Sequence, residues 1–146
     1  MRRLPILALP VLAVCFSLPA RSEYQTVNEA AVLYDTPSLQ GTKSSIIRRD
    51  TPVEVVYSLE NLVKVRVADG TMAWIEKKYL SPHRTVIVKA EQADILQRPE
   101  EGAPTSFRAE RDVLLRYLET LPGGWIRVRH DDGEEGYARA SEVWGF

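Results

Sequence analysis

Cysteine and histidine are scarce in this chain of 146 residues, which contains one cysteine and two histidines. A single cysteine excludes a disulfide framework within the chain, and so few soft ligands exclude a structural zinc site. Charge of one sign is lacking too, because 19 basic and 20 acidic residues give a formal net charge of −1. We therefore expect no nucleic-acid partner, since neutralising phosphates over a broad surface needs a basic excess. The remaining composition, 45% hydrophobic and 27% charged, is typical of a globular protein.

A long hydrophobic run is also lacking outside the first residues. Two arginines precede an uncharged stretch at residues 4–18, which is shorter than the roughly 20 residues of a membrane span. Small residues, Ala20 and Ser22, follow at the positions of a cleavage site. Residues 1–22 therefore have the pattern of a secretory signal peptide, cut after Ser22 or Ala20. Such a signal predicts a periplasmic or secreted protein.

Two alternatives to a cleaved signal stay open. The same segment could be an N-terminal membrane anchor, although its three prolines disfavour a long helix. It could also direct lipidation of Cys15, although Val14 stands where lipoprotein signals have a small residue. Removing residues 1–22 leaves no cysteine, 16 basic and 20 acidic residues, and no stretch suited to a stable membrane span.

The rest of the sequence contains two copies of one unit. Residues 62–75 and 125–138 align at an offset of 63, and each segment reads as strand, Asp-Gly turn and strand. Asp-Gly favours a tight hairpin because glycine adopts a positive φ at low cost. Insertions and deletions confined to the loops between such strands are what a shared core predicts.

The match continues upstream at other offsets. Residues 53–57 align with residues 113–117 at an offset of 60, whereas Leu33 aligns with Ile95 at 62. This alignment predicts that the first loop of the second copy is shorter by two residues. It also predicts that the loop before Trp125 is longer by three residues.

Strand-like periodicity dominates both copies. Residues 63–67 alternate apolar and basic side chains, as a half-buried strand does. Residues 110–118 resemble a helix, but their aligned partner, residues 51–58, is rich in β-branched residues, which favours a strand for both. We therefore expect an all-β protein with two tandem five-stranded barrels, residues 23–83 and 84–146, after a cleaved signal peptide. No Gly- or Ser-rich linker separates the copies, so we expect a rigid tandem.

Three segments resemble a known family: residues 32–38 (VLYDTPS), 63–81 (VKVRVADGTMAWIEKKYLS) and 123–145 (GGWIRVRHDDGEEGYARASEVWG). The sequence is similar to bacterial Src-homology-3 (SH3) domains in tandem. The family signature is a Trp-x-x-Val strand, an Asp-Gly hairpin, a Gly-Trp-type pair and a short turn before the last strand. The second copy has this pattern, whereas the first has Leu62 for the tryptophan and Ala73 for the glycine. The last five residues resemble an exported proteobacterial subgroup.

The resemblance implies an SH3-like barrel in each copy and a non-catalytic role in binding cell-wall peptide or glycan, or a protein segment. It places a groove between the long first loop and the loop before the third strand, lined by aromatic side chains. Each aromatic candidate could instead pack in the barrel core, as we expect for Trp144. The candidates for the groove are Tyr34, Tyr79, Trp125, Trp74 and Tyr137.

Catalytic and metal chemistry find little support in the sequence. The acidic turn at residues 131–135 lacks the spacing of an EF-hand, and carboxylates at a solvated hairpin tip keep ordinary pKa values. No nucleophile elbow occurs, and His83 and His130 lie in different copies. A basic ladder on equivalent strands is best read as a solvated face with cross-strand partners such as Glu54. That ladder consists of Lys64, Arg66, Arg127 and Arg129.

We therefore expect an exported binding protein that is not an enzyme and uses neither metal nor cofactor. The expected ligand is peptidoglycan. An adaptor that binds another envelope protein is the alternative, and a cell-wall hydrolase is a further one. The sequence leaves open which ligand is bound, whether both copies bind, and the oligomeric state.

Overall fold

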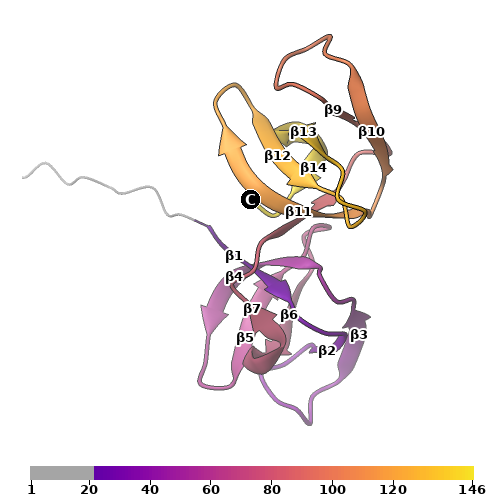
Figure 1. Cartoon of the computed structure of the whole chain (residues 1–146). Helices are drawn as coiled ribbons and strands as arrows, with labels where there is room; N and C mark the ends of the chain where they lie inside the picture. Colours follow the sequence, from indigo (N-terminus) through magenta and orange to yellow (C-terminus); the bar gives the residue numbers. More distant parts are fainter. Residues whose placement is uncertain (1–21) are drawn as a thin grey trace, which may run out of the picture.

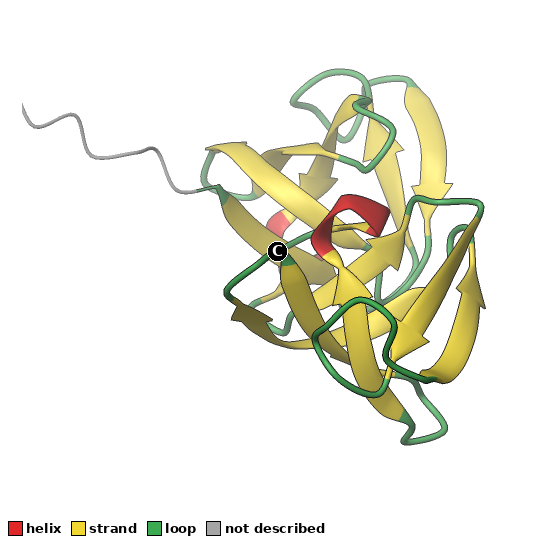
Figure 2. Cartoon of the chain, turned by 90° about the horizontal axis from the view of Figure 1, so that it is seen from above, coloured by secondary structure: helices red, strands yellow, loops and turns green. Residues whose placement is uncertain are grey.

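The computed structural model describes residues 22–146, which form two seven-stranded antiparallel sheets (Figure 1). Apart from Ser22, the expected signal peptide lies outside the described residues. No helix in the described part of the chain is long and apolar enough to cross a membrane. The helical content there is two short 3-10 turns, η1 and η2, and strands dominate the rest (Figure 2).

The first sheet belongs to the first copy and has the strand order β3-β2-β6-β5-β4-β1-β7. The 3-10 turn η1 (Lys77–Tyr79) precedes its last strand. Its strands are β1 (Glu23–Val27), β2 (Ala31–Tyr34), β3 (Lys43–Ile47), β4 (Pro52–Ser58), β5 (Leu62–Arg66), β6 (Met72–Glu76) and β7 (Leu80–Ser81).

The second sheet repeats this order as β10-β9-β13-β12-β11-β8-β14. The turn η2 (Ala140–Glu142) again precedes the last strand. Its strands are β8 (Thr85–Val88), β9 (Gln92–Leu96), β10 (Thr105–Glu110), β11 (Leu114–Leu121), β12 (Trp125–Arg129), β13 (Glu135–Arg139) and β14 (Val143–Trp144). The expected boundary between residues 83 and 84 falls between β7 and β8.

The all-β class and the tandem of two similar units are confirmed, but the predicted count of five strands per copy is wrong. Much of the difference lies in the long first loop, which does not stay irregular. Its returning arm pairs with the strand before it, as β3 on β2 and β10 on β9. Pairing satisfies backbone groups that an irregular loop would leave to water. Residues 114–121 form β11, so the choice of strand over helix for this region is confirmed.

Each copy has its own core, built by alternate residues of its strands. In β5 the burial alternates, with Val63 and Val65 inside and their neighbours half-buried. In β12, Ile126 and Val128 are likewise buried, and Trp125 before them is buried as well. The two hairpins turn at Gly70 and Gly133, whose φ values of 90° and 95° confirm the predicted Asp-Gly turns.

The strand pairing corrects the sequence alignment of the two copies. Val55 pairs with Val65, and Tyr117 pairs with Val128, so Val55 is the structural equivalent of Tyr117. The offset in β4 and β11 is therefore 62, not 60, and the two first loops have equal length. The loop before Trp125 is longer by one residue, not three. A shift of two residues along a strand preserves the in-out alternation, which is why the sequence pattern did not reveal the error.

The copies pack directly on each other along β1, β8 and the C-terminal segment (Figure 1). The Thr26 and Thr85 hydroxyl oxygens lie 3.1 Å apart in a buried hydrogen bond. The Tyr24 and Trp144 rings meet edge to face with centroids 5.2 Å apart. Trp144 is therefore half-buried at the seam between the copies, and the expectation that it belongs to a barrel core is wrong.

Candidate functional site

A row of side chains crosses four strands of the first copy on the side opposite its core. Tyr34 of β2 is paired with Trp74 of β6, Trp74 with Lys64 of β5, and Lys64 with Tyr57 of β4. Paired positions point to the same face of a sheet, so these four residues are neighbours. Met72 lies two residues before Trp74 on the same strand and shares its face. We call Tyr57, Lys64, Met72 and Trp74 the aromatic face.

Two aromatic rings of this face touch and remain open to solvent. The Tyr57 and Trp74 ring centroids are 6.4 Å apart at an interplanar angle of 89°. Tyr57 is 57% exposed and Met72 is 46% exposed, while Trp74 is half-buried. A bulge at Val56 shifts the register of β4 and turns Tyr57 onto the outer face. The edge-to-face contact fixes both rings in a geometry that aromatic pairs favour.

Exposed apolar residues are concentrated in the first copy. Among the described residues, six of the seven large exposed hydrophobic side chains belong to the first copy. Tyr57 and Met72 are part of the aromatic face, and Val56 is next to Tyr57 in the chain. Contiguous exposed apolar surface marks binding sites more often than scattered single residues do. The seven are Leu39, Ile46, Val56, Tyr57, Leu59, Met72 and Phe146.

The equivalent surface of the second copy is charged. Glu119 occupies the position of Tyr57, opposite Arg127, and Glu135 occupies that of Met72. Arg127 lies 2.7 Å from Glu135 and 3.8 Å from Glu119, so its guanidinium is held between two carboxylates. In the first copy Arg66 likewise contacts Glu54 at 3.0 Å. These pairs confirm the predicted cross-strand partners for Arg66, Arg127 and Arg129, whereas no ion pair of Lys64 occurs among the described residues.

The predicted groove residues of the first copy are only partly accessible. Tyr34 is 8% exposed, so little of its ring is available, although it adjoins Trp74 through the strand pairing. Tyr79 lies in η1, half-buried against the core of the first copy. The ammonium of Lys78 lies 4.9 Å from the centre of the Tyr79 ring. Trp74 is thus the predicted residue that the structure places on the aromatic face.

In the second copy Trp125 and Tyr137 are packed together under the first loop. Trp125 is 7% exposed and packs with Ala103 of that loop. The Arg139 guanidinium lies 5.6 Å from the Trp125 ring centre and binds both carboxylate oxygens of Glu101 at 2.8 and 2.6 Å. This bidentate bond lowers the pKa of Glu101 and raises that of Arg139. The loop is therefore tied down over the tryptophan.

Tyr57 and Met72 are the residues of this site that the sequence interpretation did not single out, and Tyr57 is the more exposed of the two. Tyr57 was aligned with Tyr117 as a strand residue, whereas the pairing makes Glu119 its equivalent. A signal was present in the sequence, because Val55, Val56 and Tyr57 are three consecutive apolar residues that break the alternation of a half-buried strand. Such a break is typical of a β-bulge.

The acidic turn is engaged in local contacts. Asp132 accepts a hydrogen bond from the backbone N–H of Glu134 and lies 3.2 Å from the His130 ring. The Glu134 amide lowers the pKa of Asp132. Glu135 turns toward Arg127 and Arg129. Within residues 22–146, no three His, Cys, Asp or Glu side chains are grouped to hold a metal ion.

Two curled antiparallel sheets, each with a 3-10 turn before its short last strand, define a tandem of small SH3-like barrels. The profile of the bacterial SH3 domain matches residues 27–82 and 89–145. The chain therefore belongs to the bacterial SH3 domain family and carries two copies of the domain. No curated protein sequence matches the chain.

Three solved structures that match the chain do so at low sequence identity and low TM-score. NlpC2 from Trichomonas vaginalis is 18% identical with a TM-score of 0.39, over 85% of this chain and 48% of that one. NlpC1 from the same organism is 17% identical with a TM-score of 0.39, over 93% and 50%. An NlpC/P60 family protein from Bacillus cereus is 15% identical with a TM-score of 0.38, over 83% and 55%. This chain spans about half the length of these proteins.

Proposed function

We propose that this protein is an exported, non-catalytic binding module, periplasmic or secreted, that recognises peptidoglycan through the aromatic face of its first copy. The exposed Tyr57–Trp74 pair is the observation that carries the proposal. Bacterial SH3 domains are generally binding modules, which agrees with this role. Residues 1–22 have the sequence pattern of a signal peptide, which supports export.

The chemistry of the aromatic face suits a ligand that combines apolar and anionic parts. Large flat rings supply contact area to sugar or peptide groups at a low cost in conformational entropy. Lys64 lies between the two rings in the strand pairing, so a carboxylate of a wall peptide bound there would meet its ammonium. The second copy offers paired charges at the same positions, so we assign the main contact to the first copy.

Co-sedimentation with purified peptidoglycan sacculi, across a salt series, tests this function. We expect residues 23–146 to bind saturably and to keep binding at moderate salt, because stacking contacts are screened little. Tyr57→Ala should weaken binding by about fivefold or more, the equivalent of about 1 kcal/mol of aromatic contact. The matched control is Ile46→Ala, which removes another exposed apolar residue of the first copy and should leave binding unchanged.

The other outcomes distinguish the alternatives. Absence of binding to sacculi, or binding lost at modest salt, would contradict the proposal and turn the search to an envelope protein as partner. Release of soluble fragments from the sacculi would indicate a hydrolase instead. Tyr137→Ala shows which copy binds. If this variant bound sacculi more weakly while Tyr57→Ala did not, the ligand surface would lie on the second copy.

A further inference from the structure

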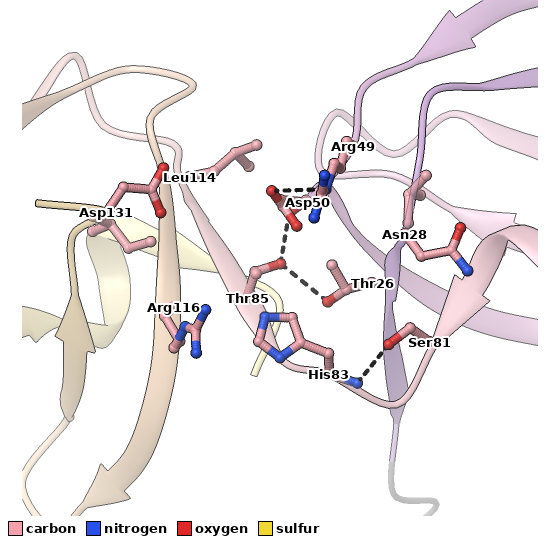
Figure 3. Close-up of a pocket in the computed structure, with 12 residues that line it drawn as sticks. Thr26, Asn28, Arg49, Asp50, Ser81, His83, Thr85, Leu114, Arg116 and Asp131 are labelled. Carbon is pink, nitrogen blue, oxygen red and sulfur yellow. Dashed lines mark hydrogen bonds and ion pairs between the residues drawn. The ribbon is translucent and has the colours of Figure 1, made fainter. Parts of the chain in front are cut away.

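A cleft of about 570 Å³ lies between the two copies (Figure 3), and no residue that lines it belongs to the aromatic face. The first copy contributes the region around Thr26 and Asp50, and the second contributes Thr85, Arg116 and Asp131. The connecting segment adds His83. The volume falls within the range of small-molecule sites, which occur preferentially where two domains meet.

Hydrogen bonds between the copies fix the walls of this cleft. The Thr85 hydroxyl bridges the two sides, because its oxygen lies 3.1 Å from that of Thr26 and 2.7 Å from the backbone oxygen of Asp50. Figure 3 shows this chain of contacts crossing the cleft floor. Arg48 adds a bond across the seam to the backbone oxygen of Asp112 at 2.9 Å. These bonds hold the two copies in a fixed relative position at the cleft, so the walls need not be ordered on binding.

Three exposed ionisable side chains in the cleft have no partner of opposite charge among the described residues. Arg49 and Asp50, which also line the cleft, form an ion pair with each other at 3.7 Å and are therefore not among the three. For Arg116, His83 and Asp131, no group of opposite charge within residues 22–146 lies at ion-pair distance. Arg116 and His83 point toward one another, and Asp131 lies on the wall of the second copy (Figure 3). Arg116 and His83 can both donate hydrogen bonds to an anionic group, and Asp131 can accept them from a cationic one. A ligand that carries both an anionic and a cationic group would complement the three side chains.

We propose that this cleft binds a small zwitterion, a free amino acid or a short peptide, between the two SH3 domains. The ligand carboxylate lies between Arg116 and His83, since guanidinium recognises carboxylate in a planar, two-point geometry and imidazole supplies a further N–H donor. The ligand ammonium is directed to Asp131. The polar floor formed by Thr85 and its partners favours a compact polar ligand over an apolar one. This site shares no residue with the aromatic face and does not depend on the proposed function.

Titration of the ¹⁵N-labelled protein with the dipeptide alanylalanine, followed by NMR, tests the site. We expect saturable shifts confined to amides around the cleft. Blocking the carboxylate of the dipeptide as an amide, or changing Arg116→Gln, should each weaken binding about tenfold, the scale of a charge-assisted pair. Lys89→Gln removes an exposed positive charge outside the cleft and serves as the matched control, with unchanged affinity expected.

The ammonium contact is tested separately. Asp131→Asn should weaken binding of alanylalanine but have no effect on its N-acetyl derivative, which has already lost the positive charge. Absence of saturable shifts, shifts that occur equally in Arg116→Gln, or shifts centred on the aromatic face would each overturn the assignment. Tyr57→Ala should leave dipeptide binding unchanged, so failure of this site and failure of the proposed function give different results.

Discussion

Gly136 shows how a single missing methyl group matters to the second barrel. An added Cβ at this position would lie 2.6 Å from Cγ2 of Ile95 and 2.8 Å from the backbone oxygen of Leu96. Its equivalent in the first copy is Ala73, which is buried beside a core that contains Leu33 where the second copy has Ile95. Gly136→Ala should therefore lower the free energy of unfolding by about 1–3 kcal/mol through overpacking, as measured by urea denaturation.

The methyl group on Cβ of Ile95 is one of the atoms that an alanine at position 136 would meet. Leucine has no branch at Cβ, so Ile95→Leu should recover part of the stability lost in Gly136→Ala, as the first copy does with Leu33 and Ala73. A double-mutant cycle measures the coupling between the two positions. If Gly136→Ala alone had the same free energy of unfolding as the unchanged protein, Ile95 and the backbone of β9 would be able to move and accommodate the added methyl group.

Only part of the candidate site could be predicted from the sequence: Trp74 was a candidate, whereas Tyr57, Met72 and the exposure of the aromatic side chains were not predicted. Trp74 follows the Asp-Gly hairpin in the repeat, and its place on an outer face follows from strand alternation. The burial of Trp125 depends on a loop more than 20 residues away in the chain, because Ala103 covers it and Glu101 holds Arg139 above it. No local pattern contains such a long-range contact.

At the scale of elements, the β12–β13 hairpin carries a cluster in which Glu135 serves two arginines. Hydrogen bonds from Arg129 and then Arg127 lower the pKa of Glu135 below its ordinary value of 4.5. A carboxyl group with a lowered pKa in the folded state stabilises that state above its ordinary pKa, and the stabilisation is lost as the pH falls through the lowered value. The melting temperature should therefore fall as the pH is lowered below 4.5, and Glu135→Gln should reduce this fall.

Glu134→Gln is the matched control for that hairpin. Glu134 is the neighbouring carboxylate, it is exposed, and no ion pair to it occurs within the described residues. Melting curves of the three proteins between pH 7 and pH 3 compare the two positions directly. If Glu134→Gln changed the pH dependence as much as Glu135→Gln, the hydrogen bonds to the two arginines would not be its cause.

Strands and hairpins could be predicted because their signals are local, whereas their pairing could not. The period of two and the Asp-Gly turns placed β5, β6, β12 and β13 correctly. The register of β4 relative to β11 was wrong by two residues, because such a slide keeps apolar residues inside. A bulge occurs at Val56 in β4 and at Leu118 in β11, and matching the two gives the correct offset of 62. The bulge at Val56 also brings Tyr57 to the surface.

At the scale of the whole molecule, the seam joins the two ends of the described chain. Tyr24 in the first strand meets Trp144 in the last, and Arg84 lies beside Tyr24 while donating to the backbone oxygen of Gly145. Burial raises the pKa of Tyr24, as expected for a phenol in a packed seam. A barrel of about 60 residues buries only about 60% of its surface, so each copy gains stability from the other. The seam thus stabilises both barrels and shapes the cleft between them.

The seam predicts that the two copies unfold together, and Gly145 tests this. Its φ is 118°, and an added Cβ would lie 2.8 Å from Cβ of Pro52 in the first copy. Gly145→Ala should lower the free energy of unfolding by about 1–3 kcal/mol and separate the urea transitions seen by tryptophan fluorescence and circular dichroism. Gly102→Ala is the matched control, because Gly102 also has a positive φ, 82°, but an added Cβ there meets nothing within 4 Å. Coincident transitions in Gly145→Ala, with the same loss as in Gly102→Ala, would mean that backbone strain alone acts and that the seam does not couple the barrels.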